Sequence, residues 1–237
     1  MIYLQSNDDN KNIPHHFDVA CAMYGAIDCG IDYKLVTYDE IISSKFDNLI
    51  RKHLFVGSVE FMREVFNRIN KQPRVPINSD REEEIITLQQ VRKRINNGET
   101  LFVKPYDIKL FTGFVVDKYS LKTLDNYPDD TKIITCKPFD KLIVSEWRVY
   151  IHMYKIFDIR NYSGDIFNIP NKNYILNIIN KYFDNFPTAY TIDVGILEDG
   201  QNVIIEFNDM WAIGNYGMDN SDYLRLLKQR YFQIIKS

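Results

Sequence analysis

Residues 190–217 contain the pattern that most constrains how this chain can fold. Two short apolar runs, 191–197 and 202–207, flank the sequence Glu198-Asp199-Gly200. An Asp-Gly pair readily adopts the positive φ that a tight turn needs, and the runs on either side have strand-like composition. We therefore predict a β-hairpin in this part of the chain.

Three polar side chains lie within this predicted hairpin. Asp193 falls in the middle of the first apolar run, and Glu206 and Asn208 lie at the end of the second. Residues two apart in a strand point to the same face, so Glu206 and Asn208 share a face that Asp193 on the partner strand can also share. Because burial of a lone carboxylate is costly, oxygen ligands that converge from paired strands indicate a bound cation.

The composition is that of an ordinary globular protein. The 237 residues are 45% hydrophobic and 26% charged, which suits one large domain or two small ones. The net charge of −3 gives no reason to expect nucleic acid or an anionic membrane as a partner. Three cysteines without metal-ligand spacing favour a reducing, cytoplasmic compartment. No apolar run approaches the roughly 18–20 residues of a membrane helix, and the polar stretch near Met1 argues against a signal peptide.

The first third of the chain predicts a small α/β sheet, because strands and helices alternate there. The expected elements are strands at 1–5, 31–37 and 53–57 and helices at 17–30 and 59–70, with a polar connection at 38–44. A proline-punctuated, extended segment at 73–79 predicts a linker. We therefore expect two domains, 1–78 and 79–237.

The second part of the chain begins with a charged segment, 81–97, which we predict as one helix because Ile85, Leu88 and Val91 recur at helical spacing. The other expected elements are strands at 101–103, 132–136 and 142–157 and helices at 173–183 and 220–236. Ser221 or Asp222 is the expected N-cap of the last helix.

Two lysines bracket a glycine-containing loop. Lys104 ends a short apolar strand at Pro105, and Lys109 follows in the loop that leads to Gly113. Glycine permits close approach of the backbone, so lysines placed in this way can neutralise a polyphosphate. The spacing alone also fits surface lysines at strand ends.

A charged pair lies within the predicted strand 142–157. Glu146, Arg148 and Tyr150 alternate with apolar residues and therefore share one face. On a ligand-binding face, Arg148 can donate a forked pair of hydrogen bonds to phosphate or carboxylate oxygens. The same pattern also fits a solvated sheet face.

The order of these motifs resembles that of the ATP-grasp ligases, and more narrowly of the clade named for one arginine and two lysines. Lys104 and Lys109 look like the two signature lysines, and Glu146 with Arg148 looks like the signature arginine segment. The resemblance covers most of the chain and is most specific from about residue 100 to 217. It implies an α/β (α+β) ATP-grasp fold in which a small α/β domain precedes the nucleotide- and metal-binding parts.

The resemblance also implies ATP and Mg²⁺ as cofactors. Asp193, Glu206 and Asn208 are similar to the family's Mg²⁺ ligand set. The segment that contains Cys136, Lys137 and Phe139 occupies the place of the linker that meets adenine. The residues expected to bind the nucleotide are these three together with Lys104, Lys109, Glu146 and Arg148. Lys104, Lys109 and Arg148 are the expected catalytic residues.

The implied function is that of an ADP-forming carboxylate–amine ligase, which works through an acylphosphate. Positioning and charge stabilisation carry such chemistry, consistent with the absence of a nucleophile motif in this sequence. The expected partners are a small molecule, peptide or protein with a carboxylate, and an amine acceptor; residues 163–165 and 211–217 are expected near them. An idle nucleotide- or partner-binding module and a small-molecule kinase are the alternatives.

Overall fold

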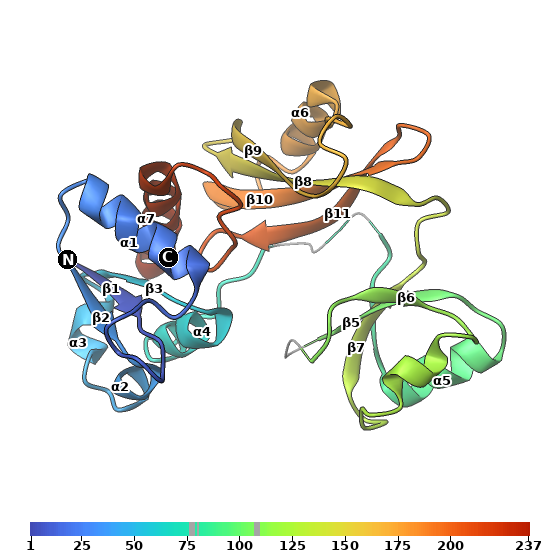
Figure 1. Cartoon of the computed structure of the whole chain (residues 1–237), viewed down its shortest axis with the longest axis horizontal. Coiled ribbons are helices and arrows are strands. Elements are labelled where there is room, and N and C mark those ends of the chain that lie inside the picture. The colour runs from blue at the N-terminus through green and yellow to red at the C-terminus, as the bar shows by residue number, and fades with distance from the viewer. Residues whose placement is uncertain (76–78, 80, 107–109) are drawn as a thin grey trace. The chain divides into compact units, whose positions relative to one another are not determined.

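The computed structural model describes residues 1–75, 79, 81–106 and 110–237 and divides the chain into two compact units (Figure 1). Unit 1 contains Met1–Asn78 and Ile143–Ser237, and unit 2 contains Ser79–Leu142. The boundary after residue 78 coincides with that of the predicted domains, whereas the division after Leu142 has no counterpart in them. The two units describe how the chain packs and do not by themselves define functional domains. The domains 1–78 and 79–237 therefore stay a prediction.

Unit 1 begins with a parallel sheet in the order β2-β1-β3. Its elements are β1 (Ile2–Gln5), α1 (Phe17–Asp28), β2 (Tyr33–Val36), α2 (Tyr38–Ile42), α3 (Asp47–Ile50), β3 (Leu54–Val56) and α4 (Val59–Asn67). The predicted strand–helix alternation is therefore confirmed. The predicted connection at 38–44 is wrong over most of its length, because Thr37 and Glu40 form a capping box that starts α2.

The rest of unit 1 is an antiparallel sheet in the order β11-β10-β8-β9. Its strands are β8 (Ile143–His152), β9 (Lys155–Gly164), β10 (Ala189–Leu197) and β11 (Asn202–Asp209). The predicted hairpin is confirmed as β10 and β11, joined at the Asp-Gly turn where Gly200 has a φ of 84°. Two helices accompany the sheet, α6 (Lys172–Lys181) and α7 (Asn220–Lys236).

The prediction of a single strand at 142–157 is wrong. These residues contain β8, a turn and the first residues of β9, which form a second hairpin. β8 ends at His152, Met153 and Tyr154 both adopt positive φ, and β9 returns alongside β8. Two left-handed residues in succession make a tight hairpin turn, for which Asn-Gly is the usual sequence. Met-Tyr lacks that signal, which explains the error.

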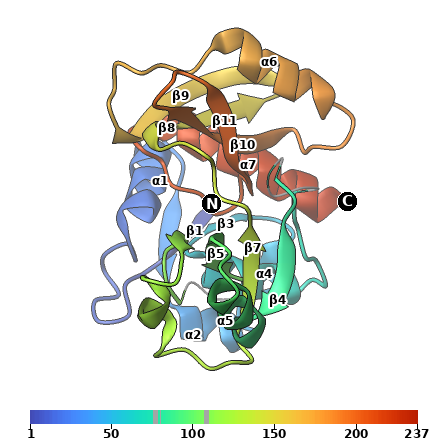
Figure 2. The same ribbon diagram turned by 90° about the vertical axis from the view of Figure 1, so that its right-hand side faces the viewer.

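Helix α6 lies on one side of this sheet and α7 on the other (Figure 2), and each face belongs to a different hydrophobic core. On one face, α6 covers a cluster that includes Val149, Ile192 and Phe207. On the other face, Tyr150 and Ala189 join a larger core that contains α7 and the N-terminal sheet. The segments before and after unit 2 in the sequence therefore share one hydrophobic core.

α7 is the longest helix in the described part of the chain. Asp219, rather than the predicted Ser221 or Asp222, is its N-cap, and the Asp219 side chain accepts hydrogen bonds from the amides of both of those residues. No helix within the described ranges has the length and apolar character needed to cross a membrane.

Unit 2 is a separate sheet in the order β4-β7-β5-β6, with a core beneath α5. Its elements are β4 (Glu84–Thr87), α5 (Leu88–Asn96), β5 (Leu101–Pro105), β6 (Phe114–Val116), the 3₁₀ turn η1 (Leu121–Leu124) and β7 (Lys132–Cys136). The predicted helix at 81–97 is wrong in its first half, because Ile85 and Ile86 pair with β7 and Thr87 caps α5. β-Branched residues favour the strand over the helical period.

Candidate functional site

One row across the antiparallel sheet of unit 1 carries four charged residues. Arg160 of β9, Arg148 of β8, Asp193 of β10 and Glu206 of β11 occupy directly paired positions. Directly opposed residues in an antiparallel ladder point to the same face. Two arginines and two carboxylates therefore lie side by side on the face opposite α6.

The central pair of this row is buried and bidentate. Arg148 donates from Nε to Asp193 Oδ1 at 2.8 Å and from Nη2 to Asp193 Oδ2 at 2.6 Å. Burial raises the pKa of Asp193 to about 6; the hydrogen bonds and charge of Arg148 oppose this rise, and Glu206 adds to it. Burial also works against the charge of Arg148, but the hydrogen bonds and charge of Asp193 outweigh it and raise the pKa of the guanidinium.

Asn208 joins the two carboxylates. Its Nδ2 donates to Glu206 Oε1 at 2.9 Å and lies 3.3 Å from Asp193 Oδ2. The amide thus places its positive end between two acidic groups, where a small cation would also be stabilised. Turning the amide over would present its oxygen instead, because the two ends of an asparagine side chain have nearly the same shape.

The residues present fit a magnesium ion. Mg²⁺ prefers oxygen ligands and takes one or two carboxylates, which Asp193 and Glu206 supply. Thr191 is directly paired with Asn208 and fully buried, yet its hydroxyl finds no hydrogen-bond partner among the residues described here. A buried polar group without a partner is unusual, and this one lies next to the candidate ligands in the ladder.

The candidate ligands in unit 1 are too few to complete the coordination of a metal ion by themselves. Within the described ranges, no three or more His, Cys, Asp and Glu side chains gather as a metal site. The set in unit 1 instead consists of two carboxylates and one amide. Mg²⁺ usually keeps several waters and binds phosphate oxygens as well, so a set of this size suits it.

Two tyrosine rings lie against the Arg148 guanidinium. Its central carbon is 4.7 Å from the ring centre of Tyr216 and 5.8 Å from that of Tyr162, and the two rings stack at 5.0 Å. Burial raises the pKa of Tyr162, with the charges of Asp193 and Glu146 and a hydrogen bond to Glu146 adding to the rise. The predicted residue Glu146 therefore contacts a ring that holds Arg148.

Residues 211–217, called the tied loop below, are fixed from three directions. The Tyr150 hydroxyl lies 2.6 Å from the Gly214 carbonyl oxygen and 2.7 Å from that of Asn215. Burial raises the pKa of Tyr150, so the hydroxyl keeps the proton that it shares between these oxygens. Asp18 of α1 accepts from the Asn215 amide at 2.7 Å, and the Tyr223 hydroxyl donates to the Ile213 carbonyl at 2.5 Å. These contacts set Tyr216 over Arg148.

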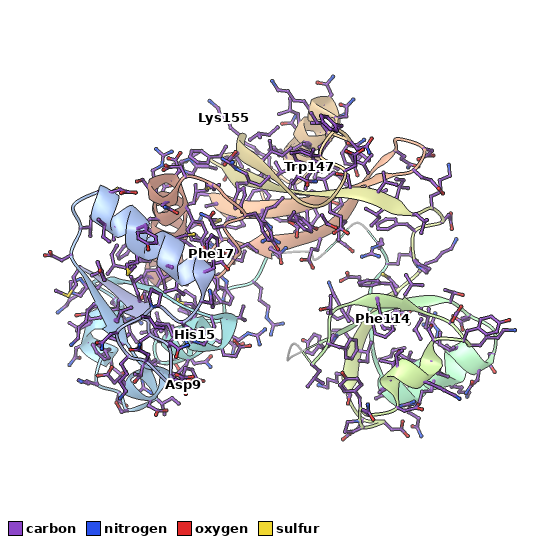
Figure 3. The ribbon with its side chains drawn as sticks, in the orientation of Figure 1. Asp9, His15, Phe17, Phe114, Trp147 and Lys155 are labelled. Carbon is purple, nitrogen blue, oxygen red and sulfur yellow. The ribbon has the colours of Figure 1, made fainter. Side chains whose placement is uncertain are left out.

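The opposite face of β8 is anchored by Trp147, marked in Figure 3. The indole lies 2.8 Å from both the Ser145 hydroxyl and the Asn168 carbonyl oxygen, and the side chain is buried. Alternation along the strand then directs Arg148 to the other face. The predicted segment 163–165 lies at this end of the sheet, where Ser163 pairs with Glu146.

In unit 2, Lys104 lies on the sheet face away from α5. Phe102 and Cys136 are paired in the ladder and share this face with Lys104, whereas Val103 points into the core beneath α5. The Lys104 ammonium is 3.6 Å from Glu83 Oε1. Burial raises the pKa of the Cys136 thiol, a rise that Arg81 opposes.

The other predicted nucleotide-binding residues of unit 2 have different surroundings. Lys137 is exposed and lies 3.3 Å from Asp140, and the Arg81 guanidinium lies 4.7 Å from the Phe139 ring centre. Lys109 lies outside the described residues. Lys104, Cys136 and Phe139 thus all belong to unit 2. In unit 1 the structure brings four predicted residues together: Arg148, Asp193, Glu206 and Asn208.

Comparison with solved structures identifies the fold as that of an ATP-grasp protein. A RimK domain protein ATP-grasp from Sphaerobacter thermophilus has a TM-score of 0.59 at 10% identity, covering 98% of this chain and 99% of that one. The D-alanine–D-alanine ligase of Bacillus anthracis has a TM-score of 0.53 at 11% identity, covering 99% and 97%. The ATP-grasp ligase PsnB, complexed with a minimal precursor, Mg and ADP, has a TM-score of 0.52 at 8% identity, covering 97% and 96%.

The sequence places the chain more narrowly. It belongs to an ATP-grasp domain family, the one designated family 2 of the clade named for one arginine and two lysines, which matches residues 79–226. This result confirms the resemblance and the α/β fold expected from the sequence. Among curated protein sequences, none matches the chain significantly.

Several side chains at the site were not predicted. Arg160 pairs directly with Arg148 only because β8 and β9 form a hairpin, and the Met153-Tyr154 turn of that hairpin carries no sequence signal. Tyr216 lies in the segment 211–217 that was expected near the substrate, but its contact with Arg148 was not predicted. The contacts of Tyr162, Tyr216 and Asp18 depend on a bulge, a left-handed turn and a pairing of residues 197 apart in sequence, which no local pattern indicates.

Proposed function

We propose that the protein is an ATP-dependent, ADP-forming ligase that joins a carboxylate to an amine. The observation that carries the proposal is the convergence of Arg148, Asp193, Glu206 and Asn208 on one sheet face, in a chain of the ATP-grasp family. Known structural neighbours include a D-alanine–D-alanine ligase and the ligase PsnB. Membership in the family supports ATP binding, and the reaction itself is our inference.

In this proposal, unit 1 holds the cation and the reacting phosphate. Asp193, Glu206 and the Asn208 oxygen would hold Mg²⁺, which supplies charge neutralisation to phosphate oxygens. Arg148 would donate its forked hydrogen bonds to the phosphoryl group as charge develops on it. The buried setting strengthens each of these interactions relative to water.

Unit 2 contributes nucleotide binding. Lys104 and Lys109 would pair with phosphate oxygens, and Cys136, Lys137 and Phe139 would lie along the base. The partly buried Lys104 ammonium lies 3.6 Å from the Glu83 carboxylate. Both lysines act as charges, because phosphoryl transfer is catalysed mainly by positioning and electrostatics.

The substrate would carry a carboxylate that attacks the γ-phosphate, releasing ADP and giving an acylphosphate. An amine then displaces inorganic phosphate from this intermediate. PsnB has been solved with a precursor peptide, and a peptide donor is one substrate class that we would test here. Residues 163–165 and the tied loop are the segments proposed nearest the substrate.

The test is an ADP-release assay over a panel of amino acids and peptides, with hydroxylamine added to capture an acylphosphate as its hydroxamate. ADP formation with a hydroxamate and an amide product by mass spectrometry supports the ligase. ADP formation with a stable phosphorylated product indicates a kinase. ATP binding without ADP release across the panel indicates an idle module, and either result removes the ligase proposal.

Two variants separate the site from the fold. Lys104→Ala and Glu206→Ala should abolish ADP release while circular dichroism and the unfolding midpoint stay close to wild type. Lys228→Ala and Glu198→Ala, both at exposed positions, are matched controls that should keep full activity. Activity retained by either site variant would refute the assignment of that residue.

A further inference from the structure

Arg148 and Asp193 form a buried ion pair, called the exchange pair below. In this pair each residue uses atoms with which it would otherwise bind a ligand. Two N–H groups of Arg148 donate to the two oxygens of Asp193, at 2.8 and 2.6 Å. Both side chains are almost fully buried, at 6% and 3% exposure. Arg148 therefore occupies one lone-pair site on each oxygen of Asp193, Asn208 Nδ2 lies 3.3 Å from Oδ2, and two N–H groups of the guanidinium are occupied, so each residue keeps only part of its binding capacity.

The proposed function gives each member of the pair a different partner. Asp193 would hold the cation, and Arg148 would hold a phosphate or carboxylate group. Neither new contact can form fully while the forked pair is intact. Full binding of a cation by Asp193 and of an anion by Arg148 therefore competes with the forked pair.

We propose that the exchange pair couples cation binding to anion binding, because each ligand releases the residue that the other ligand needs. A cation alone would leave Arg148 buried without its carboxylate, and an anion alone would leave Asp193 without its arginine. Both situations are unfavourable in a buried site. When both ligands bind, each residue gains a new partner. This inference rests on the proposed function and describes how the same site is regulated.

The surroundings of the pair favour such an exchange. Glu206 is paired directly with Asp193, and the Asn208 amide contacts both carboxylates, so a second acidic group and a rotatable ligand are already in place. Tyr216 and Tyr162 contact the guanidinium through their rings. Such cation–π contacts use no N–H donor and can persist when the fork changes its partner.

The same sheet face offers a matched control. Arg160 pairs directly with Arg148 in the ladder, and its Nε donates to Asp158 Oδ2 at 2.8 Å. Arg160→Met removes the same charge as Arg148→Met from the same face without touching Asp193. Asp158→Asn is the corresponding control for Asp193→Asn.

The experiment needs neither ATP nor substrate. Mn²⁺, which shares the preference of Mg²⁺ for oxygen ligands, is titrated by electron paramagnetic resonance, and sulfate is titrated calorimetrically. We expect Arg148→Met to bind Mn²⁺ at least tenfold more tightly than wild type and Arg160→Met to show a much smaller gain. We expect Asp193→Asn to bind sulfate at least tenfold more tightly than wild type, unlike Asp158→Asn.

In the wild type, sulfate should strengthen Mn²⁺ binding, and Mn²⁺ should strengthen sulfate binding by the same factor. Equal Mn²⁺ affinities in the two arginine variants, or no Mn²⁺ binding by Arg148→Met at millimolar metal, would overturn the proposal. Equal sulfate affinities of Asp193→Asn and Asp158→Asn would also overturn the proposal. This second comparison tests the proposal even if Arg148→Met does not fold. A positive exchange result with no ligase activity would refute the proposed function alone, whereas ligase activity without coupling would refute the exchange alone.

Discussion

Thr191→Val tests whether the sheet face that carries the candidate metal site is destabilised by a buried hydroxyl without a hydrogen bond. Thr191 is fully buried, and its hydroxyl has no partner among the described residues. Burial of a hydroxyl without a hydrogen bond costs about 1–3 kcal/mol in mutational data. Valine has the same shape and no hydroxyl, so we expect the variant to raise the free energy of unfolding of unit 1 by about that amount.

Thr135→Val is the matched control. Thr135 is equally buried, in β7 of unit 2, but its Oγ1 donates to the Phe102 carbonyl oxygen at 2.8 Å. Loss of that bond should lower the free energy of unfolding by about 0.5–1.5 kcal/mol. The two substitutions are chemically identical, so opposite signs would be attributable to the hydrogen bond.

Urea titration separates the two effects, because both tryptophans, Trp147 and Trp211, belong to unit 1. Tryptophan fluorescence follows Thr191→Val, and circular dichroism follows Thr135→Val. Destabilisation of unit 1 by Thr191→Val would refute this reasoning.

Three further substitutions have defined outcomes. Arg230→Met leaves the buried Asp209 carboxylate without its two hydrogen bonds at 2.6 Å and should destabilise unit 1 by about 3–5 kcal/mol in urea titration. Tyr150→Phe removes the hydroxyl that holds the tied loop, so we expect a loss of about 1–2 kcal/mol and faster proteolysis within that loop; unchanged cleavage would contradict the role given to Tyr150. Glu206→Gln should weaken Mn²⁺ binding at least tenfold, whereas Glu198→Gln in the exposed turn should leave it unchanged.

Local patterns were sufficient for the central hairpin of the site. The Asp-Gly turn and the two-residue period predict that Glu206 and Asn208 share a face, and the structure places them there in contact. These features depend on residues close in sequence, so they can be predicted without knowledge of the three-dimensional structure.

Other features depend on pairings between distant segments. The contact of Arg148 with Asp193 spans 45 residues and follows from the register of β8 against β10, which no local pattern specifies. The turn at Met153 and Tyr154 lacks the usual glycine, and β4 has the spacing of a helix. In both places tertiary pairing decides the backbone conformation against the local sequence signal.

The division of unit 1 into two sequence segments has a consequence for its synthesis. The core shared by the N-terminal sheet and α7 includes Phe66, Leu227 and Tyr231, which lie on either side of the unit 2 segment. Unit 2 has its whole core within one continuous segment and can fold as soon as that segment leaves the ribosome. The N-terminal sheet must wait, with part of its apolar surface uncovered, until α7 has been made. Slower translation lengthens this interval, and transiently uncovered apolar surface of this kind favours aggregation.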